Sequence, residues 1–157
     1  MTYQHDFVSE NAVSQQELRA LLSGLSDSDL MHDPGDGWTV AVMLAHMAFY
    51  DFRAAAVVDR WQSESAIDPF PLDARLTNSV TEKLWQAIPP RSAVQLALQA
   101  AEAADARMAG LSPELAARIA VSERSVSLFR SEHRREHIEQ IKQGLASRPH
   151  TAPAAGS

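Results

Sequence analysis

Residues 130–141 read RSEHRREHIEQI, and this short stretch decides how the rest of the chain is interpreted. It carries two histidines, His133 and His137, four residues apart. Residues at i and i+4 of an α-helix stand one turn apart on the same face, so the two imidazole rings would lie side by side. They fall in line with Val126 and Ile141, which indicates that this face points into a core. Imidazoles in such a position need a hydrogen-bond partner or a metal ion.

The N-terminal half of the chain predicts two helices. Ser14 followed by Glu17 has the form of a capping box, and leucines at helical spacing continue to Gly24, where the first helix is expected to end. Thr39 is a natural N-cap for a second, long helix, which contains neither Pro nor Gly as far as about Gln62. Its inward face is predicted to hold Met43, His46, Met47, Tyr50, Ala54, Val57 and Trp61.

The C-terminal half predicts two more long helices. One runs from Ser92 to a C-cap at Gly110, and Ser112 can then cap a short helical turn. The last helix begins between residues 122 and 125, contains the two histidines and ends with Gly144 as its C-cap. These positions follow from the spacing of apolar residues and from the residue types at the helix ends.

An extra helical segment is expected in the connection before the third long helix. Residues 72–88 carry apolar residues every four positions, although Asn78-Ser79 could divide the segment into two pieces. No stretch alternates apolar and polar residues as a half-buried strand does. The sequence therefore predicts an all-α protein, a four-helix bundle formed by one domain over residues 1–145, with a disordered tail over residues 146–157.

Composition narrows the classes of function. The 157 residues carry a net charge of −6, which argues against nucleic-acid binding because that function needs a concentrated basic face. No cysteine is present, so disulfides, thiolate metal sites and a cysteine nucleophile are excluded. We identify neither a signal peptide nor an apolar run of about 20 residues that would span a membrane. These features predict a cytoplasmic protein without a membrane partner.

The spacing of the histidines suggests a metal site. Besides His133 and His137, His46 is the histidine that falls on an apolar helical face, and bundles build metal sites from facing helices. Three neutral imidazoles and one open position suit catalytic Zn²⁺, Ni²⁺ or Fe²⁺. Spacing alone leaves a second interpretation open, in which His46 is a hydrogen-bonded core residue and the other two form a surface pair on a charged helix.

Other polar and aromatic residues near these histidines also have two interpretations. Tyr50, one turn after His46, either hydrogen-bonds a substrate or fills the core. Gln140, one turn after His137, either orients that ligand or faces solvent, and Glu136 has the same two options. Trp38 is expected to fix the start of the second helix against the bundle. The remaining histidines, His5, His32 and His150, occur in polar or irregular contexts and are not expected to be ligands.

Two motifs resemble signatures of a known family. Residues 37–40 (GWTV) followed by residues 44–47 (LAHM) resemble the first signature of the DinB/YfiT-like four-helix bundle superfamily. Residues 133–141 (HRREHIEQI) resemble its closing signature, which has the form H-x-x-x-H-x-x-Q-I. The two motifs occur in the family's order, and the likeness covers roughly residues 10–145. Asp51 stands near a position where relatives often carry an acidic residue.

The resemblance implies a fold and a function. It implies an up-down-down-up bundle in which His46, His133 and His137 bind one divalent metal, usually nickel or zinc, with iron or manganese as further occupants. It also implies an enzyme in which the metal activates a thiol or water to attack a small electrophilic substrate. Tyr50 would help to shape that pocket, and characterised relatives use low-molecular-weight thiols such as mycothiol or bacillithiol. The alternative is a non-catalytic bundle that binds a small molecule or forms a homodimer, with an empty or vestigial histidine cluster.

Overall fold

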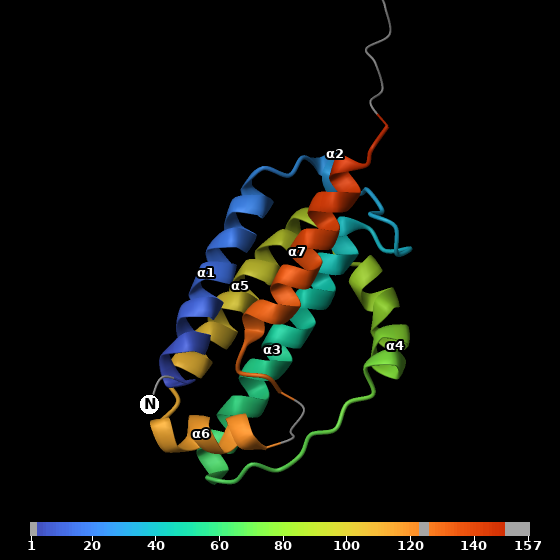
Figure 1. The fold of residues 1–157 in the computed structure, drawn as a ribbon. Coiled ribbons are helices and arrows are strands. Elements are labelled where there is room, and N and C mark those ends of the chain that lie inside the picture. Colours follow the sequence, from blue (N-terminus) through green and yellow to red (C-terminus); the bar gives the residue numbers. More distant parts are fainter. Residues whose placement is uncertain (1–2, 123–125, 150–157) are drawn as a thin grey trace, which may run out of the picture.

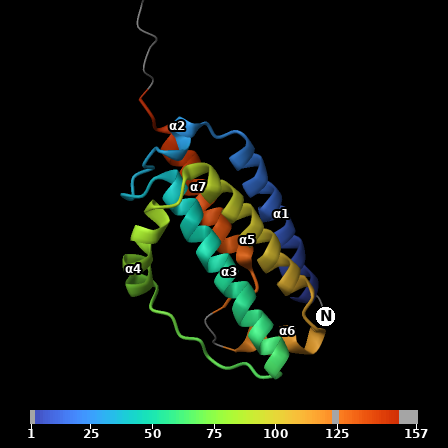
Figure 2. The same cartoon turned by 180° about the vertical axis from the view of Figure 1, so that it is seen from behind.

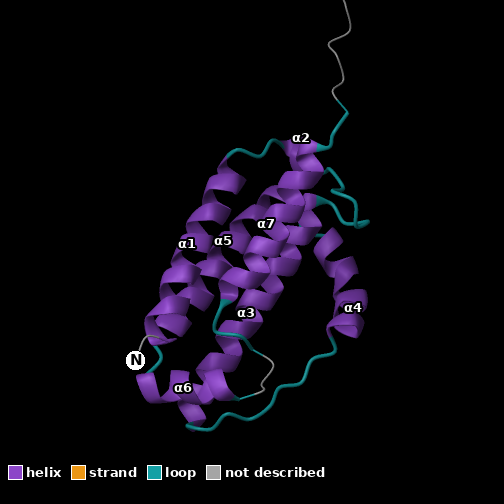
Figure 3. Cartoon of the chain, in the orientation of Figure 1, coloured by secondary structure: helices purple, strands orange, loops and turns teal. Residues whose placement is uncertain are grey.

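Helices are the regular elements of the part of the chain that the computed structural model describes, residues 3–122 and 126–149. The predicted all-α class is thereby confirmed, and Figure 3 shows helices joined by loops without a strand in these ranges. In chain order the helices are α1 (Tyr3–Ser23), α2 (Asp27–Leu30), α3 (Val40–Glu64), α4 (Ala74–Gln86), α5 (Pro90–Ala109), α6 (Pro113–Val121) and α7 (Arg130–Ala146).

The four long helices α1, α3, α5 and α7 lie side by side (Figure 1). Helix α3 contacts α5 and α7, and α1 contacts the same two helices, so the four close around a common interior. In both Figure 1 and Figure 2, α1 and α7 run toward the end of the molecule that carries α2, whereas α3 and α5 run away from it. Helix α4 lies outside this group and packs against α3. This arrangement brings α3, α4 and α7 together along one side.

The first helix begins much earlier than the sequence predicts. Helix α1 starts at Tyr3, so Ser14 is not its N-cap but lies in its middle, where it is fully buried. The Ser14 hydroxyl donates to the carbonyl oxygen of Asn11 at 2.9 Å, and the Asn11 side chain donates to the carbonyl oxygen of Leu128 at 2.8 Å. The inward face of α1 is thus polar where it meets the start of α7. A polar inward face interrupts the apolar period, which is why the capping-box interpretation was wrong.

Helix α3 has the expected start. The hydroxyl of Thr39 accepts a hydrogen bond from the amide of Val42 at 3.2 Å, which confirms Thr39 as the N-cap. The helix continues two residues past Gln62 and ends where Ser65 adopts a left-handed conformation with φ of 53°. By length and hydropathy α3 is a candidate to cross a membrane, but 72% of its most apolar window is buried inside the protein. A core helix of a soluble bundle passes the same test, because burial among helices also requires apolar residues.

Helix α4 is continuous through Asn78-Ser79, so the possible break does not occur. Asp73 caps it by accepting from the amide of Leu76 at 2.9 Å. Its buried residue is Trp85, which packs into the core near α3. The opposite face exposes Leu76, Val80 and Leu84 by 61%, 63% and 66% of their surface. The four-residue apolar spacing therefore marks an outer face of the molecule rather than a buried one.

The ends of the C-terminal helices differ in part from the prediction. Ser112 caps α6 as expected, and Gly110 follows α5, which starts two residues before Ser92. Helix α7 begins only at Arg130, whereas its start was expected between residues 122 and 125, of which residues 123–125 lie outside the described ranges. Gly144 is not its C-cap, because α7 continues to Ala146. Of the predicted tail, residues 150–157 lie outside the described part of the chain.

Gly144 instead permits a close contact between α7 and the loop before α3. A Cβ atom at this position would lie 2.2 Å from the Cβ atom of Pro34, which is far inside van der Waals contact. The Gly144 carbonyl oxygen also accepts a hydrogen bond from Nε2 of His32 at 3.1 Å. The glycine therefore serves packing in the interior of a helix, although glycine lowers helix propensity there.

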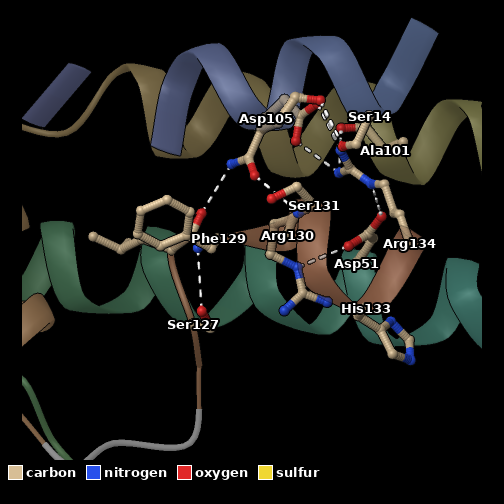
Figure 4. Close-up of polar contacts among 12 residues, drawn as sticks. Ser14, Asp51, Ala101, Asp105, Ser127, Phe129, Arg130, Ser131, His133 and Arg134 are labelled. Carbon is tan, nitrogen blue, oxygen red and sulfur yellow. Dashed lines mark hydrogen bonds and ion pairs between the residues drawn. The ribbon is translucent and has the colours of Figure 1, made fainter. Parts of the chain in front are cut away.

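A buried ion-pair network joins α7 to the other long helices (Figure 4). The carboxylate of Asp51 on α3 accepts from Nε of Arg130 at 2.8 Å and from Nε of Arg134 at 3.0 Å. Arg134 also donates to both oxygens of Asp105 on α5, at 2.6 and 2.9 Å. Its remaining acceptors are the hydroxyl oxygen of Ser14 and the carbonyl oxygens of Asn11 and Ala101. Asp51, Arg130 and Arg134 are therefore buried charges and not part of a solvated surface.

Replacing Asp51 by asparagine should destabilise the protein strongly. The Asp51→Asn variant leaves Arg130 and Arg134 buried without their shared counter-charge, so we expect the free energy of unfolding to fall by about 3–5 kcal/mol. The matched control is Asp59→Asn, which removes the exposed ion pair with Arg107 at 3.0 Å and should cost less than about 1 kcal/mol. Urea unfolding of the two variants measures the difference, and equal losses would contradict a structural role for the network.

Candidate metal centre

Three histidines meet where α3 faces α7. His46 lies about two turns after the Thr39 cap of α3, and His133 and His137 stand on successive turns of α7. Nε2 of His133 lies 3.2 Å from Nε2 of His46 and 3.1 Å from Nε2 of His137. One ring nitrogen from each residue lies within 4.8 Å of the others. The structure therefore brings together the three residues that the sequence singled out.

The cluster is enclosed by aromatic rings. The ring centroid of His46 lies 5.1 Å from Trp38, 5.1 Å from Trp85 and 4.8 Å from Tyr50. His46 and His137 are buried, whereas His133 is half-buried and its centroid lies 5.5 Å from that of Tyr50. An apolar enclosure excludes water and strengthens electrostatic interactions inside it. His133 and Tyr50 are partly exposed, so this is the side of the cluster that is open to solvent.

Hydrogen bonds among the three rings cannot satisfy all of their nitrogens. A neutral imidazole nitrogen either donates one hydrogen or accepts with one lone pair. Nε2 of His133 can therefore satisfy one of its two short contacts, but not both. In addition, Nδ1 of His46 and Nδ1 of His133 are buried without a partner among the described residues. A group bound to the Nε2 atoms would leave both Nδ1 atoms unsatisfied, so it is the crowding at Nε2 of His133 that indicates a site for a further group.

A divalent metal fits the three converging nitrogens. Two imidazole nitrogens that each lie about 2.1 Å from a tetrahedral zinc ion are about 3.4 Å apart, close to the 3.1 and 3.2 Å that separate Nε2 of His133 from its neighbours. One electron-pair acceptor at the centre would satisfy all three Nε2 atoms at once. Nδ1 of His137 lies 2.7 Å from Oε1 of Gln140, the kind of contact that fixes the tautomer of a metal-ligating histidine.

The environment keeps the imidazoles neutral. Burial, together with smaller effects of the neighbouring His137 and His133, lowers the pKa of His46 from 6.5 to about 3. Burial likewise lowers the pKa of His133 to about 3, with contributions from His137, Arg130 and Arg134. The pKa of His137 is also lowered by burial, although its hydrogen bond with Gln140 opposes that shift. Neutral imidazole is the form that binds metals, so the site is prepared for a cation at neutral pH.

The neighbouring residues resolve several of the alternatives that the sequence left open. Tyr50 borders the cluster, and its hydroxyl donates to Oδ1 of Asn78 on α4 at 2.9 Å. Burial raises the pKa of Tyr50, so its hydroxyl stays protonated. Gln140 contacts His137 rather than facing solvent, Glu136 is exposed, and Trp38 packs on Trp85 as well as on His46. His32 bonds to Gly144 outside the cluster, His5 has no described side chain and His150 lies outside the described residues.

Sequence reasoning missed the charged residues beside the cluster. Arg130 and Arg134 flank His133 along α7 and are buried, although arginine is usually exposed. The available signal was the spacing of these residues, since Arg130, Arg134 and His137 follow the same steps of three and four that mark an inward face. The contribution of α4 was also missed, because Asn78 and Trp85 reach the site from an element whose packing the sequence does not specify.

The comparison with protein families agrees with this geometry. The family model described as the DinB superfamily matches residues 11–141, which include all three histidines. No curated protein and no solved structure matches the chain. Because the match spans most of the chain and covers α3, α5 and α7 entirely or nearly so, the chain belongs to the DinB superfamily.

Proposed function

We propose that this protein is a metal-dependent enzyme in which His46, His133 and His137 bind one divalent ion. The convergence of three Nε2 atoms in a buried cluster carries this proposal. Nickel and zinc are the proposed occupants, and iron is a further candidate because imidazole suits it as well, whereas manganese favours oxygen ligands. The directions of the four long helices support the up-down-down-up bundle that accompanies such a site in the family.

The proposed reaction is the attack of a thiol or water on a small electrophilic substrate. When bound, the metal would act as a Lewis acid, which would lower the pKa of a coordinated thiol or water molecule toward neutral pH. Gln140 holds the ring of His137, and the aromatic rings of Trp38 and Trp85 limit access of bulk water. Tyr50 borders the open side, where its hydroxyl can contact a substrate. These roles fit a transferase that uses a low-molecular-weight thiol, or a hydrolase. We propose that the enzyme acts in the cytoplasm.

One observation supports a second candidate function. The outer face of α4 exposes Leu76, Val80 and Leu84, and an exposed apolar face of this kind is typical of an interaction surface. A bundle that forms a homodimer or binds a small molecule, with a vestigial histidine cluster, would also present such a face. The two functions differ in whether the histidines bind a metal, so metal content separates them.

Protein purified without an affinity tag should contain close to one transition metal per chain. The His133→Ala variant should lose it, because this variant removes the nitrogen that lies between the other two. At a hundredfold excess over Kd, the ion should stabilise the wild-type protein by about 3 kcal/mol. Elemental analysis and thermal unfolding with added Ni²⁺ or Zn²⁺ measure both quantities.

His32→Ala is the matched control, because His32 bonds to the Gly144 carbonyl oxygen outside the cluster, and this variant should retain the metal. A wild-type protein that contains no metal, and whose melting temperature does not respond to Ni²⁺ or Zn²⁺, would contradict the proposed enzyme and favour the non-catalytic bundle.

The metal-free protein should lose stability as the pH falls below about 6.5. In that range the unfolded chain protonates all of its histidines, whereas folded His46 and His133 stay neutral until about pH 3. The unfolded state therefore binds more protons, and each histidine should cost about 1 kcal/mol per pH unit. Urea unfolding with chelator between pH 7.5 and 5 tests this, with His46→Leu expected to show a shallower slope. Stability that is constant or rises on acidification would contradict the buried neutral cluster.

A further inference from the structure

Arg130 is a buried cation whose hydrogen-bonding capacity is only partly used. It is 8% exposed, and its Nε donates to Asp51 Oδ1 at 2.8 Å. By contrast, every nitrogen of the neighbouring Arg134 donates to at least one acceptor on another helix. Among the described residues, no acceptor bonds the two terminal nitrogens of Arg130. A guanidinium that is held in place and has unused donors can bind a ligand that supplies acceptors.

The unused edge of Arg130 is accessible. In the described part of the chain, the fully enclosed side-chain atoms without a partner are Nδ1 of His46 and Nδ1 of His133, so the terminal nitrogens of Arg130 still contact solvent. The Arg130 side chain keeps 10% of its surface exposed. Asp51 holds the guanidinium from its Nε side, which leaves the end with two parallel N–H groups free. The orientation of this end is therefore set before any ligand arrives.

This free end lies beside the histidine cluster. Arg130 precedes His133 by three residues, so the two side chains stand one turn apart on the same face of α7. Figure 4 shows the terminal nitrogens of Arg130 and the ring of His133 on the same side of the network, away from Asp105. After burial and His137, the charge of Arg130 is a further cause of the low pKa of His133. The charge of Arg130 also acts on Arg53, whose side chain lies near Tyr50.

We propose that the terminal nitrogens of Arg130 bind a carboxylate of the substrate, which places the reacting part of that molecule beside the histidine cluster. Two parallel N–H groups match the two coplanar oxygens of a carboxylate, whereas a neutral carbonyl group offers only one oxygen. One free guanidinium edge suits a planar monoanion better than a phosphate, which needs more donors. The substrate class is therefore a small organic acid. The binding of the carboxylate does not depend on the proposed metal-dependent enzyme, whereas the reaction of the bound acid does.

The test compares an acid and an amide of the same shape. Wild-type protein, as purified, is titrated calorimetrically with 3-mercaptopropionate and with 3-mercaptopropionamide, which share a thiol and differ in the carboxylate. A charge-assisted pair with Arg130 should make the acid bind about tenfold more tightly or better. The preference should disappear in Arg130→Gln. It should persist in Arg135→Gln, which removes an arginine of the same helix that pairs with Glu10 and Glu17 on the surface.

The outcomes separate this proposal from the proposed metal chemistry. Equal affinity for acid and amide in the wild-type protein, binding of neither compound, or a preference that survives in Arg130→Gln would overturn the carboxylate site. The wild-type comparison remains decisive even if Arg130→Gln fails to fold. A preference for the acid in protein that contains no metal would support the Arg130 site and would contradict the metal-dependent reaction alone.

Discussion

The side chain of Arg134 is the interaction on which the interior of this protein depends. It is fully buried on α7 and hydrogen-bonds to acceptors on α1, α3 and α5. Transfer of a guanidinium from water into a protein interior is costly, and good geometry with two carboxylates offsets that cost. Any rotation or shift of α7 would break several of these bonds at once. The network therefore selects one register for α7 relative to the other three long helices.

That register determines where the histidines point. Because Arg134 faces the interior, His133 and His137 are directed to the side where α3 and α4 meet α7, and there they reach His46. Asp51 contributes to both arrangements, since it binds Arg134 on one side and orients Arg130 next to His133 on the other. The same carboxylate that stabilises the interior thus also shapes the surroundings of the site. Stability and the proposed function are physically coupled through this one residue.

The sequence predicts the apolar parts of this architecture well and its polar parts poorly. The all-α class and the Thr39 and Ser112 caps follow from helical periodicity and capping chemistry. The meeting of the three histidines was one of two interpretations of their spacing, and the family resemblance implied it. The early start of α1 does not, because Asn11 and Ser14 are buried polar residues whose partners lie more than 110 positions away. Gly144 was misinterpreted for a related reason, since glycine at a helix end and glycine at a close helix contact look alike in sequence.

The role of charged residues on α7 shows the same limit. Periodicity places Arg134 on the inward face, but a buried arginine is favourable only if distant acids meet it, and their positions depend on the packing of α3 and α5. The partners of Tyr50 and Trp85 likewise depend on how α4 docks. Features that rest on one helix can be inferred from the sequence alone. Features that need several helices at one point require the three-dimensional structure.

The central claim is that the three histidines form a single metal centre. X-ray absorption spectroscopy at the metal edge of the purified protein tests it most directly, because this method reports the number, type and distance of ligands around a bound ion. The account predicts three imidazole nitrogens at about 2.0–2.1 Å from the ion. It also predicts the loss of one of them in His46→Ala. A protein without a bound ion, or an ion with a coordination shell that lacks imidazole, would contradict the claim.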